Sequence, residues 1–526
     1  MEPNNTLSNK ELSDLRIKKV NALRVKILNH IENKTLEQIN NIDVSEFKDF
    51  DNLFAEFDNL IKQIKEFKKI EINIPDEINL NNWNISNVTS MQNTFRKTKI
   101  KFLISKWNTS NVKNMKGMFS ETSEIDDIAT KDIKDNKDEF LYTAWDTSNV
   151  IDMQQMFYKA ESFDQDISNW NTSNVTNMKG MFTEASLFNG NINTKHIDLG
   201  KYTAWDTSNV TDMTAMFQQA ILFERDISNW NTSNVTTMRN MFLDAVKFNS
   251  KINHDFLDDG KEVWNTSKVK NMYSMFSKAK NFQGDISSWD TSNVEDMTGM
   301  FAYAESFNSN LSWNTSNVKS MNSMFGEAVS FKGDISIWNT SNVTNMSTMF
   351  YKAKLFEGDI SKWNTSKVEN MQGMFFGAEF FNCNINTKKI DDDYIAWNTS
   401  NVTNMIEMFN NAKIFNSDIS NWDTSKVTNM ENMFNNAIKF DTDINTKISQ
   451  GHFFEIEGIV GFGNLYDLPG MNKANYKGSA DVMGKKNGQG KLTYNDDYFF
   501  DGIWRNNEFI SGKTKFDVLG ITISQS

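Results

Sequence analysis

The sequence has one cysteine, Cys383, and four histidines among 526 residues. A single cysteine excludes an intramolecular disulfide, so packing between segments must stabilise the fold. No window approaches the roughly 18 consecutive apolar residues of a membrane-spanning helix, which excludes such a helix. Lys plus Arg number 55 against 68 Asp plus Glu, a net charge of −13. This acidic balance argues against nucleic acid as a partner and against a polybasic membrane contact.

The N-terminal segment 1–30 contains no long apolar run, no small-residue cleavage site and no lipobox cysteine. A secretory leader combines a charged start, an apolar stretch and a cleavage site. We therefore expect no signal peptide in this sequence.

Thirteen of the fourteen tryptophans begin one repeated phrase, W-(N/D)-(T/I)-S-(N/K)-V-x-x-M-x-x-(M/T)-F. The phrases start at Trp83, Trp107, Trp145, Trp170, Trp205, Trp230, Trp264, Trp289, Trp313, Trp338, Trp363, Trp397 and Trp422. Subtracting successive positions gives eight steps of 24 or 25 residues and four steps of 34 to 38. A period of this length is typical of a solenoid, in which each unit buries its apolar face against its neighbours.

The unit around Trp338 predicts a short strand followed by a helix. Apolar residues recur at the helical offsets 0, 3, 6, 7 and 10, namely at Val343, Met346, Met349, Phe350 and Ala353. Ser341 lies just before them, where a hydroxyl caps the free N–H groups of a first helical turn. Residues 334–338 are β-compatible and lie between Gly333 and this cap, so we interpret them as a strand.

One strand and one helix in each short repeat leave room only for tight turns, so successive strands should lie parallel in one sheet. The expected fold class is an α/β repeat solenoid of the leucine-rich-repeat type. Its strands would line the concave side, since strands are spaced about 4.8 Å and helices about 8 to 10 Å. The repeated aromatic side chains then form the core, each contributing about 1.5 to 3 kcal/mol when buried. An aromatic binding stripe is the alternative.

The Asn-Thr-Ser runs match the N-glycosylation pattern in almost every unit. A helix cap together with a ladder of stacked asparagines explains the same runs equally well. Both interpretations stay open at this point.

The phrase W-N-T-S-N-V-T-N-M-S-T-M-F-Y-K-A followed by F-x-G-D-I-S-x-W resembles the BspA-like bacterial surface-protein repeat, a divergent leucine-rich repeat. This resemblance covers the thirteen units. It implies a solenoid of the kind found in surface, adhesion or secreted proteins. Members of that family usually carry a signal peptide or a lipoprotein cysteine, which this sequence does not show.

The sequence before the repeats divides at residue 41. Residues 1–41 form an N-terminal amphipathic helical segment with apolar residues at helical intervals, at Leu12, Leu15, Val20, Leu23, Ile27 and Ile31. Residues 42–80 form a degenerate capping repeat in which Phe50 takes the place of the first methionine and Leu53-Phe54 that of Met-Phe. We expect the helix to fold onto this cap, with pairing to another chain as the alternative.

Residues 81–450 form the thirteen-unit solenoid, and residues 451–526 change to glycine- and aromatic-rich sequence with hairpin-like spacing. The last segment resembles MORN repeats. The resemblance is carried by Tyr476, Gly478, Gly488, Gly490, Tyr494, Gly502, Trp504 and Gly512. Ser479 and Ala480 depart from that pattern. The resemblance implies a small all-β segment of extended hairpins, which we expect to cap the solenoid.

The four long steps place their extra residues in one slot, between the phenylalanine after each alanine and the next tryptophan. These insertions should protrude from one edge, and early in the array they occur at every second repeat. Solenoids commonly place their contacts on such insertions, although neutral loop growth would give the same pattern. The candidate partner-binding residues in these edge loops are His196, Tyr202, His254, Asp258, Asp392 and Tyr394.

The sequence offers no candidate catalytic, cofactor-binding or metal-binding residue. No metal-ligand spacing, phosphate-cradling glycine loop or nucleophile elbow occurs. We therefore predict a non-enzymatic protein without a cofactor that binds a protein or glycan partner through its edge loops or concave face. The family resemblance favours the cell surface or secretion, whereas the lack of a visible signal favours a cytoplasmic scaffold organised by the solenoid and its MORN-like end. The oligomeric state stays open.

Overall fold

The structure is a computed structural model that describes residues 9–135, 137–197, 201–256, 260, 262–390 and 394–440, and the backbone of four C-terminal strands. It divides into two compact units, Met1–Val294 and Glu295–Ser526. The helices are α1 (Asn9–Glu32), α2 (Leu36–Ile39) and α3 (Phe57–Lys68). The strands are β1 (Glu77–Asn79), β2 (Lys101–Leu103), β3 (Lys131–Lys134), β4 (Phe140–Ala144), β5 (Lys195–Ile197), β6 (Tyr202–Ala204), β7 (Asp255–Phe256), β8 (Glu262–Val263), β9 (Lys388–Lys389), β10 (Ile395–Ala396), β11 (Asn475–Ala480), β12 (Lys486–Asn495), β13 (Tyr498–Arg505) and β14 (Glu508–Phe516).

Each repeat is a chain of tight turns, and the predicted helix in each unit is wrong. In the Trp338 unit the N–H groups of Val343, Met349 and Ala353 each donate to a carbonyl three residues back. Between residues 69 and 440 the described residues contain no helix. The helix was predicted from the spacing of the apolar residues. A row of three-residue turns points side chains to one side at the same intervals of three and four residues as a helix does. Ser341 is therefore no helix cap, and residues 334–338 form a turn instead of a strand.

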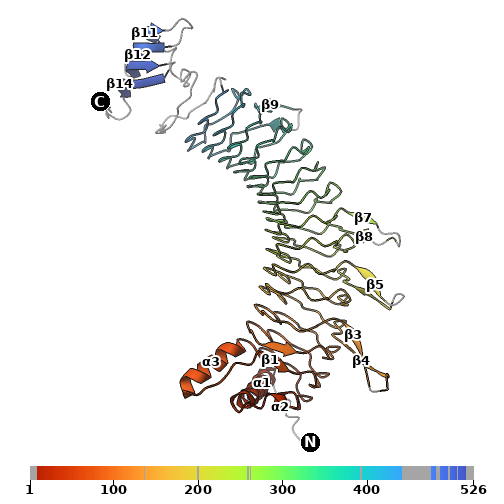
Figure 1. Ribbon diagram of the computed structural model, residues 1–526. Coiled ribbons are helices and arrows are strands. Elements are labelled where there is room, and N and C mark those ends of the chain that lie inside the picture. Colours follow the sequence, from red (N-terminus) through yellow and green to blue (C-terminus); the bar gives the residue numbers. More distant parts are fainter. Residues whose placement is uncertain are drawn as a thin grey trace, which may run out of the picture. The chain divides into compact units, whose positions relative to one another are not determined.

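Alternate N–H groups leave the unit and bind its successor, which is why no helix forms. The N–H groups of Met346, Thr348 and Phe350 donate to carbonyl oxygens of the next repeat across 3.0, 2.7 and 2.9 Å. Single parallel bridges mark this ladder from unit to unit, as between Asn345 and Asn370. Parallel stacking is thus confirmed, but it runs through the segment predicted to be helical. The turns of stacked chain are visible in Figure 1.

The ladder requires a left-handed backbone at two places in every unit, the tenth and the fourteenth position after the tryptophan. In the Trp338 unit these are Thr348 (φ 52°) and Lys352 (φ 51°), and few of these positions hold glycine. A left-handed conformation costs a non-glycine residue about 1 to 2 kcal/mol. The hydrogen bonds to both neighbouring repeats hold the backbone there.

The repeated aromatic residues form the core, as predicted. Successive Met-Phe phenylalanines stack face to face, with centroids 5.6 Å apart for Phe301 and Phe325. Successive tryptophans stack at 6.2 Å for Trp313 and Trp338, with planes 2° apart. All four side chains are buried. The tryptophans are therefore packing residues, and the alternative of an exposed aromatic stripe made of them is wrong.

The W-N-T-S-N run is a set of turn and stacking contacts. The side-chain oxygen of Asn339 accepts the N–H of Ser341 at 3.0 Å. The hydroxyl of Thr340 donates to Asn364 O of the next repeat at 2.9 Å, and the amide of Asn342 donates to Ser316 O of the preceding one at 2.7 Å. Aspartate makes the same turn in four other units, at Asp146, Asp206, Asp290 and Asp423. Because aspartate cannot carry an N-glycan, turn formation explains the N/D alternation better than glycosylation does.

The N-terminal helix lies against the first turn of the stack. Its residues Val20, Leu23, Ile27 and Ile31 are buried, whereas Leu15 of the predicted apolar stripe is 44% exposed. Residues 42–56 follow the repeat ladder, since Phe50 N donates to Ser90 O at 2.9 Å as a methionine N does elsewhere. The helix α3, which the sequence analysis did not predict, follows this turn (Figure 1).

Strands β11 to β14 form one antiparallel sheet in chain order. Four glycines lie opposite one another across it, at Gly478, Gly490, Gly502 and Gly512. These glycines are among the residues that carry the MORN resemblance, and the hairpin-like spacing of this segment therefore corresponds to antiparallel strands.

Candidate interaction surfaces

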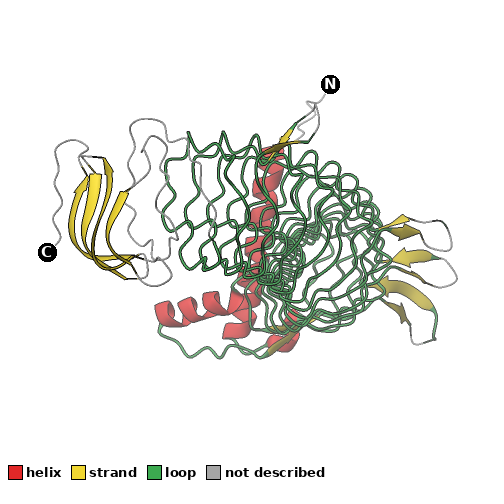
Figure 2. Cartoon of the chain, turned by 90° about the horizontal axis from the view of Figure 1, so that it is seen from above, coloured by secondary structure: helices red, strands yellow, loops and turns green. Residues whose placement is uncertain are grey.

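The four long insertions each form an antiparallel β-hairpin. The pairs are β3 with β4, β5 with β6, β7 with β8, and β9 with β10. The first three belong to the unit Met1–Val294, and they project side by side from one edge of the stacked turns (Figures 1 and 2). Insertion in one slot therefore produces a row of hairpins, called here the hairpin row and made of the described residues 131–135, 137–144, 195–197, 201–204, 255–256, 260 and 262–263.

A local change of backbone at the tryptophan creates each hairpin. In a standard unit the tryptophan N–H closes a turn, as Trp230 N does to Ile227 O at 3.2 Å. In an inserted unit the N–H binds the preceding tryptophan instead, as Trp205 N does to Trp170 O at 3.0 Å, and Trp205 has φ 50°. The indole of Trp205 still donates to Ile167 O at 2.9 Å. The tryptophan side chain thus stays in the core, while the inserted residues before it leave the stack and form the hairpin.

A tyrosine three residues before the tryptophan anchors three of the hairpins. The hydroxyl of Tyr202 donates to Asn169 O at 2.7 Å, Tyr142 donates to Lys106 O at 2.6 Å, and Tyr394 donates to Lys362 O at 2.9 Å. Each acceptor belongs to the preceding repeat. Two of the predicted partner-binding residues, Tyr202 and Tyr394, therefore hold their hairpins in place, with half-buried side chains.

The predicted histidines lie on two neighbouring hairpins. His196 on β5 is 3.2 Å from the hydroxyl of Thr203 through Nδ1, and His254 before β7 is 2.8 Å from Glu262 Oε1 through Nε2. Hydrogen bonds from the Asn265 side chain and then from His254 hold the pKa of the Glu262 carboxyl below its ordinary value. The other two predicted residues, Asp258 and Asp392, lie outside the described residues.

Exposed apolar side chains on the row were missed by the sequence analysis. Phe140 is 60% exposed, Leu141 56% and Phe256 63%. The signal was present, since the insertions are otherwise rich in charged residues and these positions have no counterpart in the repeat phrase. Rings and aliphatic chains at hairpin tips contribute to binding when a partner covers them.

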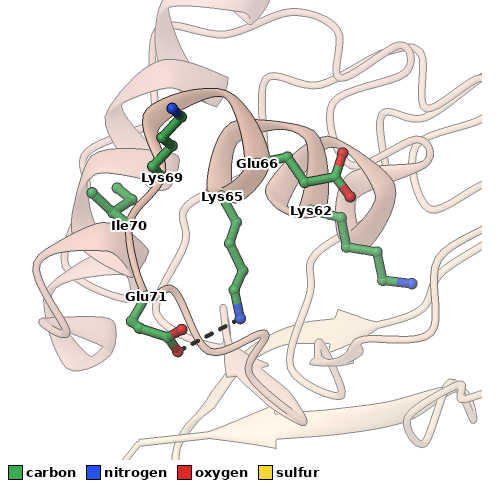
Figure 3. A pocket seen from close by; sticks show the side chains of 6 residues that line it. All are labelled: Lys62, Lys65, Glu66, Lys69, Ile70 and Glu71. Atoms are coloured by element: carbon green, nitrogen blue, oxygen red, sulfur yellow. Dashed lines mark ion pairs between the residues drawn. The ribbon is translucent and has the colours of Figure 1, made fainter.

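A hollow of about 330 Å³ at the end of α3 carries mixed charge (Figure 3). It is lined by Lys62, Lys65, Glu66, Lys69, Ile70 and Glu71. Lys65 pairs with Glu71 at 3.6 Å. Side chains of both charge signs thus line this hollow.

The cysteine is not set up for chemistry. Burial raises the pKa of the Cys383 thiol to about 11, so the thiol stays protonated at neutral pH. Its sulfur accepts the N–H of Ile360 at 3.4 Å, as the Ser250 hydroxyl accepts the N–H of Ile227 at 3.1 Å in another unit. Within the described ranges, no three His, Cys, Asp or Glu side chains gather to hold a metal ion. Nor does any described helix have the length and apolar character needed to cross a membrane.

The repeat region is similar to a known protein family. Residues 65–193, 193–312, 255–338, 311–392 and 386–453 match the model of the family described as "Mycoplasma protein of unknown function, DUF285". The comparison with curated proteins gave no match. A chain in "Crystal structure of TLR13-ssRNA13 complex" is 10% identical over 73% of this chain and 49% of that chain, with a TM-score of 0.20. This chain thus spans about half the length of that one, and a TM-score this low supports no argument about fold or ligand.

Proposed function

Since the chain belongs to the Mycoplasma DUF285 family, whose description assigns no activity, we propose from the geometry that it is a binding protein that docks a protein partner on the hairpin row. The proposal depends on one observation. Hairpins repeated at every second unit, two of them anchored by Tyr142 and Tyr202, expose Phe140, Leu141 and Phe256. Anchoring lowers the entropy lost on binding, and apolar tips supply the contact area.

The resemblance to BspA-like repeats supports a surface or adhesion role for this binding protein. The alternative is an intracellular scaffold, which the separate four-stranded sheet β11–β14 and its MORN-like glycines support. Protease treatment of intact cells distinguishes the two. Loss of the protein from unbroken cells supports surface exposure, whereas protection until lysis supports the scaffold.

Photo-crosslinking tests the hairpin row. A photoreactive residue at position 140 or 256 should capture one partner protein from cell-surface extracts, and the purified partner is then titrated with the full chain. Replacing Phe140, Leu141 and Phe256 with alanine should weaken binding at least about tenfold, because truncated anchors commonly cost about 1 to 2 kcal/mol each. A matched control replaces Leu187 and Ile337, which are 50% and 67% exposed outside the hairpins. Equal affinity of the two variants would refute the hairpin row as the site.

A further inference from the structure

The ladder has an outward face in the unit Glu295–Ser526 that differs chemically from the hairpin row. It consists of the side chains at the seventh, ninth, tenth, thirteenth and fourteenth positions after each tryptophan, and we call it the ladder face. In the repeats of Trp338 and Trp363 its half-buried residues are Asn345, Thr348, Tyr351, Asn370, Gln372 and Phe376.

Two aromatic rings stack on this face. The centroids of Tyr351 and Phe376 lie 4.7 Å apart with planes 21° apart. Unlike the core rings, both are partly exposed, and Tyr303 two repeats before Tyr351 is 44% exposed. In the repeats of Trp289, Trp313, Trp338 and Trp363 these three rings lie among mainly polar and small residues at the ladder-face positions.

A buried glycine packs beside the ring pair. A Cβ added at Gly373 would lie 3.3 Å from Thr348 Cγ2 and 3.9 Å from both Tyr351 Cδ2 and Phe376 Cβ. Its φ of +56° also disfavours any side chain. Position 373 therefore favours glycine, which packs directly against Thr348 and the ring pair.

Amide groups of fixed orientation lie at the seventh position of the same ladder face. The side-chain oxygen of Asn345 accepts Ser347 N–H at 2.9 Å, and that of Asn370 accepts Gln372 N–H at 3.0 Å. These bonds fix each amide plane. Among the described residues, neither Nδ2 group has an acceptor, so two N–H donors per repeat are available to a ligand.

In the three repeats of Trp313, Trp338 and Trp363 the ladder face carries no net charge. From Ser320 to Gly377 the charged residues at its positions are Glu327 and Lys352, and they pair with each other at 3.1 Å. The bond to Glu327 raises the pKa of the Lys352 ammonium. A polyanion would need unpaired cations here, and a cationic partner would need unpaired carboxylates.

We propose that this ladder face binds an uncharged carbohydrate. Sugar rings have an apolar face that covers aromatic surface and hydroxyl oxygens that accept hydrogen bonds. The Tyr351–Phe376 pair supplies the surface, and the amides of Asn345 and Asn370 supply donors without the desolvation of a charge. Few placed polar groups beside apolar surface are the usual composition of a specific small-ligand site. This site is separate from the hairpin row and does not depend on it.

The full chain is tested against a printed panel of neutral hexose and N-acetylhexosamine oligosaccharides, with sulfated and sialylated oligosaccharides beside them. We expect binding to a subset of the neutral set. In calorimetry with the best neutral oligosaccharide, Tyr351→Ala and Phe376→Ala should each weaken binding about tenfold, as loss of a stacked ring commonly does. Tyr351→Phe should retain binding because the ring remains, and Asn370→Leu should weaken it because the donor is lost.

Phe380→Ala is the matched control, because Phe380 is 50% exposed in the Trp363 repeat but lies outside the ladder face. Its affinity should equal that of the unmodified chain, and thermal melts confirm that each variant folds. Binding to none of the neutral oligosaccharides, binding to charged ones only, or equal losses in Phe376→Ala and Phe380→Ala would overturn the proposal. The hairpin triple variant should bind the carbohydrate normally, so failure of one proposal is distinguishable from failure of the other.

Discussion

The indole Nε1 of Trp338 donates a hydrogen bond to the carbonyl oxygen of Leu311 in the preceding repeat, across 2.8 Å. Both residues are buried, at 4% and 0% exposure. The same bond from a tryptophan to the preceding repeat recurs along the stack, as from Trp230 to Ile192. The tryptophan therefore does two things, since its ring stacks and its N–H satisfies a buried carbonyl.

Trp338→Phe should lower the free energy of unfolding by about 1 to 3 kcal/mol, because a buried Leu311 carbonyl loses its donor. Urea unfolding followed by circular dichroism measures the change. The control, Ile337→Thr, alters a side chain that is 67% exposed and should change stability by less than about 0.5 kcal/mol. Similar losses in the two variants would show that the hydrogen bond contributes nothing specific.

Ala215→Gly should stabilise the protein by roughly 0.5 kcal/mol, because Ala215 has φ 56°, where glycine avoids the steric cost of a side chain. Part of that gain is lost because glycine gives up more backbone entropy on folding. Gln218→Gly, three residues later and outside the left-handed region, should instead destabilise by about 0.5 to 1 kcal/mol. Opposite signs in urea unfolding are the expected result; a loss at both positions would contradict the assignment of strain.

Arg24→Met should loosen the first turn of the stack. Arg24 Nη2 donates to Ala55 O at 2.5 Å, in the place of an N–H from a preceding repeat, and its guanidinium lies 5.6 Å from the Phe57 ring centre. Burial lowers the pKa of Arg24, although it stays protonated. Hydrogen exchange of residues 42–57 should report a loss of roughly 1 to 2 kcal/mol. The exposed pair of Lys19 and Glu46 provides the control, Lys19→Met, which should leave this exchange unchanged.

Cys383 should react slowly with iodoacetamide at pH 8, because its pKa of about 11 leaves little thiolate. Mass spectrometry of the folded protein should show labelling far slower than in urea. Cys383→Ser should keep stability within about 1 kcal/mol, since Ser250 makes the equivalent hydrogen bond in its own repeat. Equal labelling rates in folded and unfolded protein would contradict the half-buried, protonated thiol.

Acid should weaken the repeats through their Asp-x-Ser turns. The backbone N–H of Ser336, followed by its hydroxyl, lowers the pKa of Asp334 from 3.8. A carboxyl whose folded pKa is lowered adds stability that is complete well above 3.8 and disappears as pH falls through 3.8 to the folded value. Asp334→Asn keeps the side-chain acceptor without titrating. Between pH 5 and 2 it should therefore lose less stability than the unmodified chain in urea titrations, and parallel curves would contradict the assignment.

The periodic sequence predicted much of the fold for a clear reason. Stacking requires the same buried residue at the same place in each unit. The recurrence of residues such as Trp338, Met346 and Phe350 therefore identifies the core positions. The helix prediction failed because apolar spacings of three and four residues are common to helices and to rows of turns. The two structures differ in the acceptor of each backbone N–H group. The N–H of Met346 donates to the carbonyl oxygen of Asn370 in the next repeat, and not to a carbonyl within its own unit.

The candidate surfaces were predicted less well. The insertion slot placed the hairpin row, yet Tyr202 anchors one of its hairpins and Tyr394 anchors the β9–β10 hairpin outside it. Phe140 and Phe256 are the exposed apolar residues of the row. The face with Tyr351 and Phe376 escaped notice because their positions hold different residues in other repeats, and no period marks them.

The sequence by itself determined the repeat, the buried residues and the edge from which the insertions project, because burial and insertion recur with the period. The tertiary structure alone decided that each unit is a row of turns with two left-handed residues, and which side chains of neighbouring repeats meet outside the core. Those features depend on hydrogen bonds and contacts between residues a whole repeat apart, and such pairs have no local signal in the chain.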